Sequence, residues 1–361
     1  MPDKIALLVD NKRIENFKSY IIEADLYTAD DAFSLEVSNP EIEIKKGHQC
    51  DLYINDKHEF TGIVDRVIRG YDKGGTKLRI EGRDLMGLLV DSYCEEFITL
   101  QNTTVKALAE RLLKKVPFIN RKKIIYQSNF SGKLKNKAKT GSTVAFLDTP
   151  HAYSQIEPGM TIFEVLKDYA GSRGMMFFTL HDGTFVFGKP KETGDPLFNL
   201  VCTKEGWNNN VLEGEFIEDI STLHSKYTVV GQQQGKDSID TTAINTKTTI
   251  ENKTWPFYEN GKLRMYKPYV ARNNNDYQSP ALAARMALEQ ARYQGFQLTY
   301  KVPGHSQGGR NWTINELAEV NDDVLGVKGS YLIYGRTFEL SKERGTYTTL
   351  KLGIRGGVAP Q

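Results

Sequence analysis

The feature that most constrains the fold is an internal repeat of strand patterns toward the two ends of the chain. In each copy an alternating apolar segment comes first, FSLEVS from Phe33 and FQLTYKV from Phe296. A stretch of mixed polarity follows, and each copy ends in a long hairpin whose turn contains glycine, residues 61–82 and 334–354. Alternation is the pattern of half-buried strands. Any two hairpins look alike, but three elements matching in order favour two homologous small β units.

The repeat divides the chain into two strand blocks and two insertions, so we expect an α+β fold that is mainly β. An alternating strand block has one apolar face and needs its own core, and the insertions make the two copies unequal. The expected parts are a first block in residues 1–95, an inserted α+β domain in 96–192, a second block in 193–235 with 293–361, and a second, smaller insertion in 236–292 with a helix at 280–293.

Helix signals are concentrated in the insertions. Apolar residues from Val105 to Val116 recur at helical spacing, and Pro117 ends the pattern. Thr161 and Glu164 have the spacing of a capping box at the start of a second helix. The hairpin MMFFTL-HDGT-FVFG follows, and Ser279 with Pro280 opens the third helix, which stops near Gly295.

A lysine-rich segment, residues 131–142, lies between the first two helices. It carries Lys133, Lys135, Lys137 and Lys139 without any apolar period. We expect a mobile, solvated loop, because such a sequence cannot offset its ordering entropy. The alternative is a basic arm that touches a partner or nucleic acid.

Charge and cysteine content exclude several classes of site. Lys plus Arg number 47 and Asp plus Glu 45, so no global basic field points to nucleic acid. The chain has three cysteines, Cys50, Cys94 and Cys202, and no two of them lie at metal-ligand spacing. We therefore expect no disulfide and no metal site, and we expect synthesis in a reducing cytosol. The first apolar run, broken by Asp10 and Lys12, is no signal peptide, and no stretch reaches the about 18 apolar residues of a membrane helix.

No motif predicts catalysis or a cofactor. The segment Gly231 to Asp237 is similar to a phosphate loop but is one residue short and has Asp in place of Ser or Thr. His58-Glu59 lacks a second His at helical spacing, and Cys202 with His224 could form a thiol protease pair only if the fold brought them together. The remaining candidates are better explained as turn, surface or core residues: the adjacent carboxylates Glu95-Glu96 and Asp322-Asp323 and the scattered Trp207, Trp255 and Trp312.

Three stretches, in this order, resemble the baseplate hub proteins of Mu-like contractile phages, which are tail proteins related to other contractile injection systems. The first is FTGIVDRVIRGYDKGGTKLRIEGRDLMGLLVD, in which Gly82-Arg83-Asp84-Leu85 closes the first block. The second is IEPGMTIFEVLKDYAGSRGMMFFTLHDGTFVFGKP. The third runs from ALAARMALEQARYQG through WTINELAEVNDDVLGVKGSYLIYGRTFELSKERGTYTTLKL. Together they span most of the chain, which departs from the usual pattern in its lysine-rich loop.

The resemblance implies a structural, non-enzymatic role. It implies that the two strand blocks are tandem tail-tube-like β-barrels and that the protein is a homotrimer, a ring of six barrels. One face of the ring would meet the sixfold tail tube and the other the threefold spike. Two blocks of different topology, or two blocks in one continuous sheet, would count against this adaptor role. The implied partners are the spike, tube and tape-measure proteins, with DNA only in transit through the channel and no stable membrane insertion. The implied location is the baseplate of the virion tail, after synthesis in the host bacterial cytoplasm.

Two other classes of function stay open at this point. One is a hub-associated enzyme that degrades the cell envelope, a lysozyme or a peptidase, which needs a convergent pair of catalytic groups. The other is a carbohydrate-binding tail protein, which needs clustered exposed aromatic residues. We expect no catalytic, cofactor-binding or metal-binding residues.

Overall fold

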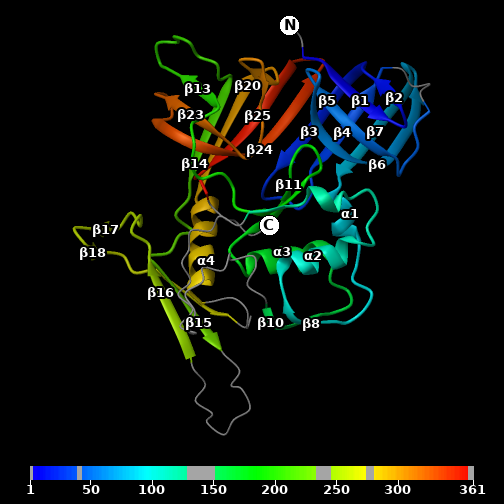
Figure 1. Ribbon diagram of the computed structural model, residues 1–361. Coiled ribbons are helices and arrows are strands. Elements are labelled where there is room, and N and C mark those ends of the chain that lie inside the picture. Colours follow the sequence, from blue (N-terminus) through cyan, green and yellow to red (C-terminus); the bar gives the residue numbers. More distant parts are fainter. Residues whose placement is uncertain (1–2, 39–42, 128–150, 233–244, 274–279, 357–361) are drawn as a thin grey trace.

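The computed structural model describes residues 3–38, 43–127, 151–232, 245–273 and 280–356. A strand-rich layer lies at one end of the molecule, and the two insertions extend from one side of it (Figure 1). The chain is mainly β with few helices, as the sequence predicts.

Each strand block contributes one curved part of the main sheet. Strands form here because alternate residues are apolar and face a shared core, which is the pattern along β4 and β20. The first block consists of β1 (Ile5–Val9), β2 (Lys12–Ile14), β3 (Phe17–Asp25), β4 (Ala32–Val37), β5 (Gln49–Ile54), β6 (Lys57–Asp72) and β7 (Gly75–Asp84). The second consists of β13 (Phe198–Cys202), β14 (Glu213–Glu218), β20 (Phe296–Pro303), β23 (Glu316–Asp322), β24 (Val327–Ser341) and β25 (Gly345–Gly353).

The two blocks have the same strand order. In the sheet, the first runs β3-β4-β7-β6-β5-β1 and the second runs β14-β20-β25-β24-β23-β13. Matching strands also follow each other in the same order along the chain. One pairing differs, because β1 pairs antiparallel with β5 whereas β13 pairs parallel with β23. The repeat inferred from the sequence is therefore present in the topology.

The long hairpins β6–β7 and β24–β25 occupy equivalent places, as predicted. Each carries one β-bulge in its long first strand, between Val64 and Arg66 in β6 and between Ile333 and Gly335 in β24. From the bulge to the turn the two registers correspond residue by residue, and both second strands begin at a glycine of positive φ. A shared bulge fixes the local twist and the facing of every later side chain.

The two blocks are joined in one 13-stranded sheet, so the expectation of two separate sheets, on which the adaptor role was made to depend, is wrong. The contact is the antiparallel pair β3–β24, from Asp25 opposite Gly335 to Tyr20 opposite Leu340. An unpaired strand edge is a ready template for another strand, and here the edges of the two copies satisfy each other. Sequence alternation indicates a strand but says nothing about its edge partner.

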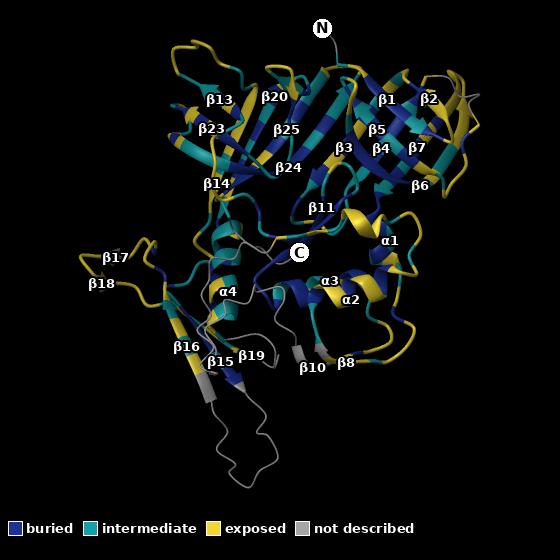
Figure 2. Cartoon of the chain, viewed as in Figure 1, coloured by how far each residue is buried: buried dark blue, intermediate teal, exposed yellow. Residues whose placement is uncertain are grey.

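One hydrophobic core runs under both blocks. Its members come from the inward positions of nearly every strand, and Figure 2 shows these buried residues along the sheet. Val64 and Phe338 are fully buried in it, and Val67 and Leu340 pack against it. Both long hairpins therefore contribute inward-facing side chains to this core.

The inserted domain between the blocks is α+β with its own core. Thr161 caps α3 through the predicted capping box with Glu164, and α2 ends four residues before Pro117. Met86 and Leu89 of α1 belong to this core, which joins the domain to the end of β7. The elements are α1 (Met86–Asp91), β8 (Ile98–Thr103), α2 (Val105–Leu113), η1 (Arg121–Lys123), β9 (Ile125–Tyr126), β10 (His151–Ile156), α3 (Ile162–Gly171), β11 (Met176–Thr179) and β12 (Phe185–Gly188).

The second insertion begins earlier than predicted. Strand β15 was expected in the second block, but it pairs with β16 and β19 in a separate three-stranded sheet against α4. The prediction failed because an alternating strand fits either sheet and only long-range pairing decides between them. The elements are β15 (Lys226–Gln232), β16 (Asn245–Glu251), β17 (Tyr258–Glu259), β18 (Lys262–Leu263), β19 (Pro268–Asn273) and α4 (Pro280–Gln294), with the short pair β21 (Ser306–Gln307) and β22 (Arg310–Asn311) farther along the chain.

Two sequence expectations fall on residues outside the described ranges, the lysine-rich segment 131–142 and the cap at Ser279. Among the helices that the structure describes, none has the length and apolar character needed to cross a membrane.

Candidate functional site

The residues considered for catalysis lie in different parts of the fold. Cys202 ends β13 opposite Asp322 in the main sheet, and desolvation raises the pKa of its thiol. His224 lies beside the rings of Tyr227 and Tyr269 in the second insertion. A protease pair needs the thiol and imidazole within hydrogen-bond reach, and each of these side chains has other neighbours.

The paired carboxylates have structural partners of their own. Asp322 is buried and accepts hydrogen bonds from the Tyr300 hydroxyl, 2.9 Å, and from two backbone amides of the following turn. Its neighbour Asp323 forms an ion pair with Lys328 at 2.8 Å. Both therefore stabilise the turn between β23 and β24. His58 lies 3.0 Å from Asp51, and Glu59 is buried against Arg336.

The three tryptophans do not form a platform. Trp255 and Trp312 are buried, and Trp207 is exposed on the connection between β13 and β14. Sugar binding by stacking would need such rings side by side on the surface. Only Gly231 and Gln232 of the loop that is similar to a phosphate loop are described, and both belong to β15.

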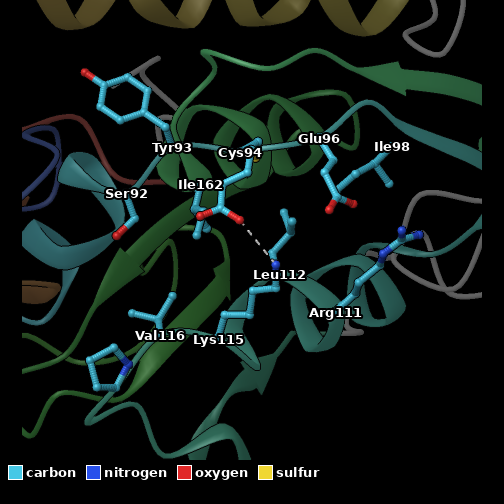
Figure 3. A pocket seen from close by; sticks show the side chains of 12 residues that line it. Ser92, Tyr93, Cys94, Glu96, Ile98, Arg111, Leu112, Lys115, Val116 and Ile162 are labelled. Atoms are coloured by element: carbon cyan, nitrogen blue, oxygen red, sulfur yellow. Dashed lines mark ion pairs between the residues drawn. The ribbon is translucent and has the colours of Figure 1, made fainter.

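A pocket of about 330 Å³ opens in the inserted domain beside α2 (Figure 3). Its rim carries the ion pair Glu95–Lys115, 3.6 Å long and exposed on both sides. The Cys94 thiol at its wall is buried, which raises its pKa and keeps it protonated. The lining mixes apolar and charged residues but contains no nucleophile with an adjacent base among its described side chains.

The most elaborate polar arrangement lies instead where the two blocks meet, and we call it the block joint. It comprises the β3–β24 strand pair and the polar side chains buried around it. Arg336 of β24 donates to Glu59 of β6 at 2.7 Å and to the carbonyl oxygen of Trp312 at 2.8 Å, with both charged side chains almost fully buried. Asn311 donates to the other Glu59 oxygen at 2.7 Å. Such a pair is costly to break because either partner alone is a buried, uncompensated charge.

A second polar chain crosses the joint at its other end. The Tyr20 hydroxyl of β3 lies 2.7 Å from His305 Nε2, and His305 Nδ1 lies 3.1 Å from the Thr348 hydroxyl of β25. Burial lowers the pKa of His305 to about 4, so the ring is neutral and serves as one donor and one acceptor. This chain links the first block to the second through satisfied hydrogen bonds.

The inserted domain reaches the joint through buried carboxyl groups. Thr179 of β11 donates to Asp84, and burial raises the pKa of Asp84 to about 7. Asp31 next to it is partly buried, and its pKa is raised by desolvation and then by Asp84. A cavity of about 210 Å³ lies among these groups, lined also by Glu59 and Arg336. The joint therefore unites three parts of the chain and is built for rigidity.

Sequence reasoning missed the residues of the joint. The burial of Arg336 could have been predicted from the sequence. Arg336 alternates with Phe338 and Leu340 along the strand, so it lies on the same apolar face as they do. A charge at such a position predicts a buried partner. Nothing in the sequence identified Glu59, which is 277 residues away.

Comparisons with known proteins agree with this geometry. Residues 4–84 match the family described as the N-terminal domain of the Mu phage baseplate assembly protein GpP-like. Residues 290–355 match a family described as the C-terminal domain of a tail protein. Both ends of the chain therefore match families of tail-protein domains. These domains contain most of the two strand blocks, including both equivalent hairpins.

Solved structures show the same fold over the whole chain. A tail protein from Neisseria meningitidis MC58 has a TM-score of 0.80 at 24% identity, covering 100% of this chain and 99% of that one. The 43 kDa tail protein of prophage MuSo2 from Shewanella oneidensis has a TM-score of 0.75 at 20% identity, covering 99% and 98%. An E. coli type VI secretion component, described as similar to the T4 tail proteins gp27 and gp5, has a TM-score of 0.57 at 12% identity, covering 98% and 79%.

A search of curated proteins found no match to the chain. The resemblance to Mu-like baseplate and tail proteins is confirmed by the family matches, and the matches support a structural role in a phage tail or baseplate.

Proposed function

We propose that this chain is the baseplate hub of a contractile phage tail or related injection system, a homotrimer that adapts a sixfold tube to a threefold spike. The observation that carries the proposal is the shared strand order of the two blocks and their edge-to-edge joint. Three copies of a chain with two similar blocks present six similar surfaces. Each chain has one insertion after its first block and a different one within its second block. In a trimer each insertion is therefore present three times around the axis.

The polar face of the sheet suits the wall of a channel. The face opposite the core carries half-buried or exposed residues of both charge signs at alternate positions, among them Glu23, Glu81, Glu339 and Lys351. Mixed charge gives no strong field of one sign, so DNA could pass without being held. The same face continues from block to block because β3 and β24 are in register.

The proposed partners follow from this arrangement. The tube protein would stack on the sixfold face, the spike on the threefold face, and the tape-measure protein would end in the channel. The proposed location is the baseplate of the virion tail, after synthesis in the host cytoplasm.

The test is the mass and symmetry of the purified protein. Light scattering should give about three times the chain mass of 40.8 kDa, and negative-stain images should show a threefold ring. An obligate interface of this kind should bury on the order of 2,000 Å² or more. A monodisperse monomer at micromolar concentration would contradict the proposal.

The enzymatic alternative, a lysozyme or peptidase, has a direct test. Purified protein should neither clear peptidoglycan nor cleave its cross-links. Cys202→Ser and His224→Ala should each behave as the unsubstituted protein in these assays. Hydrolysis that is lost in either variant would favour the enzyme.

A further inference from the structure

We propose that copies of this chain join edge to edge, with the outer half of β6 in one copy, residues 66–72, pairing antiparallel with β14 of the next copy. The inference rests on the proposed function only in requiring that the chain assembles with itself.

The first step is the equivalence of the strands. Strand β6 corresponds to β24, and β14 corresponds to β3, in the shared order of the two blocks. Within the chain, β24 of the second block pairs with β3 of the first. If the same strand pairing is repeated between the first block and the block that follows it in a ring, β6 of the first block pairs with a β14 strand. The β14 of the same chain lies at the far end of the sheet from β6, so the partner is a second copy.

The second step is that both edges are free in the described part of the chain. Beyond the bulge, residues 66–72 pair with β7 alone, and β14 pairs with β20 alone. Their exposure differs accordingly from that of the paired copies. Tyr71 is 89% exposed, whereas Leu340 at the equivalent internal position packs against the core, and Phe216 is only partly buried, whereas the equivalent Ile22 is fully buried. Exposed strand edges with apolar side chains are sites of strand addition.

The third step is the register. Arg66 and Gly335 are equivalent positions of the two blocks, because each is the first residue after the bulge in its strand. Ile22 and Phe216 are also equivalent, as the pairings of β3 with β4 and of β14 with β20 show when they are followed to the hairpins. At the internal joint Phe338 lies opposite Ile22. Transferring that register to the edges between copies places four pairs opposite each other: Arg66 with Asp219, Ile68 with Ile217, Arg69 with Phe216, and Tyr71 with Gly214.

The side chains at these positions are complementary. The β14 edge with its next residue is acidic, with Glu213, Glu215, Glu218 and Asp219 and no basic residue, whereas residues 66–72 contain two arginines and one aspartate. Arg69 would lie over the Phe216 ring and diagonal to Glu218, within reach of a long side chain.

The apolar positions match as well. Ile68 would meet Ile217, and Tyr71 would cover Gly214. Gly214 leaves no room for a larger residue, since a Cβ there would lie 2.9 Å from the Tyr300 ring. The Tyr71 ring would therefore lie beside Tyr300, which already fills the space over Gly214.

The contact uses two different surfaces, so it is head-to-tail. Such an interface closes into a ring when its rotation allows and otherwise continues as a filament. Because the internal joint and the joint between copies would be the same strand pairing, successive blocks would be related by nearly the same rotation. Every block of the ring would then be joined to the next through backbone hydrogen bonds.

Engineered cysteines test the register. In a Cys202→Ser background, Ile68→Cys with Ile217→Cys in one chain should give, after oxidation, covalent closed oligomers on a non-reducing gel with little monomer. Each single variant should stay uncrosslinked, and a mixture of the two should give dimers. The matched control, Ile68→Cys with Glu218→Cys, moves one thiol to the opposite face of β14 and should not crosslink.

Charge reversal tests the same edges without disulfides. Arg69→Glu or Glu218→Arg alone should raise the concentration needed for assembly by about tenfold, and the double variant should restore it. Lys114→Glu, a similar charge change on the exposed end of α2, should leave assembly unchanged.

The outcomes separate the inference from the proposed function. A trimer that forms normally but neither crosslinks at positions 68 and 217 nor responds to charge reversal overturns the edge pairing and leaves the hub intact. An unsubstituted protein that stays monomeric contradicts the hub itself. Crosslinks together with rescue by the double charge reversal support the pairing.

Discussion

Glu59 and Arg336 face each other across the block joint at 2.7 Å, almost completely removed from solvent. They lie on β6 and β24, the equivalent long strands of the two copies, although at positions that do not correspond. A buried ion pair therefore ties the two copies together, in addition to the more exposed Lys351–Asp25 pair at the same joint. Its burial makes it a determinant of how the blocks are oriented.

Removing the cation from this pair should destabilise the protein strongly. Arg336→Leu leaves Glu59 buried and charged, so the free energy of unfolding in urea should fall by about 3–5 kcal/mol. As control, Arg264→Leu removes the exposed Arg264–Glu259 pair and should cost less than about 1 kcal/mol. Equal effects of the two substitutions would show that the joint pair does not orient the blocks.

Asp84 should make stability fall as pH rises. Its folded pKa of about 7 lies above the unfolded value of about 3.9, so the protonated form favours folding. The resulting stabilisation is full below pH 4 and is lost between pH 4 and 7. Asp84→Asn should remove this dependence, and urea unfolding of both proteins between pH 4 and 8 measures it. A variant whose pH profile parallels that of the unsubstituted protein would refute the assignment.

Titration of His305 should make stability rise with pH, which is the opposite of the effect of Asp84, over part of the same pH range. Its folded pKa of about 4 lies below the unfolded value of about 6.5, so the neutral ring favours folding. This contribution is present above pH 6.5 and is lost as pH falls toward 4. His305→Gln should be less stable at pH 8 but should lose less on acidification. The difference in stability between the unsubstituted protein and His305→Gln should therefore grow as pH rises from about 4 to 6.5.

Gly82 should not tolerate a side chain. A Cβ there would lie 2.2 Å from the carbonyl oxygen of Ile63 and 2.6 Å from the Phe33 ring, so strand β7 would have to shift. Gly82→Ala should lower the free energy of unfolding by about 1–3 kcal/mol. Gly70→Ala in the same hairpin meets nothing within 4 Å and should be nearly neutral. Thermal unfolding of the two variants side by side distinguishes crowding from a general loss of glycine.

The sequence by itself determined the local structure and the repeat. Alternation at Phe33, Leu35 and Val37 places these residues in the core because side chains of a strand alternate between its faces. Thr161 and Glu164 determined the start of α3 because the capping box is made within one turn of chain. The matching order of elements in the two copies was visible for the same reason, since each element is defined by its own residues.

Only the tertiary structure decided which edges meet. Backbone donors and acceptors are alike on every strand, so alternation could not show that β24 pairs with β3 or that β15 leaves the second block for the insertion. Arg336 carried a hint of burial, but Glu59 became its partner only because the two blocks close on each other. Pairing between segments hundreds of residues apart depends on the packing of the whole chain, and the physical reason is that no local stretch contains both halves of the contact.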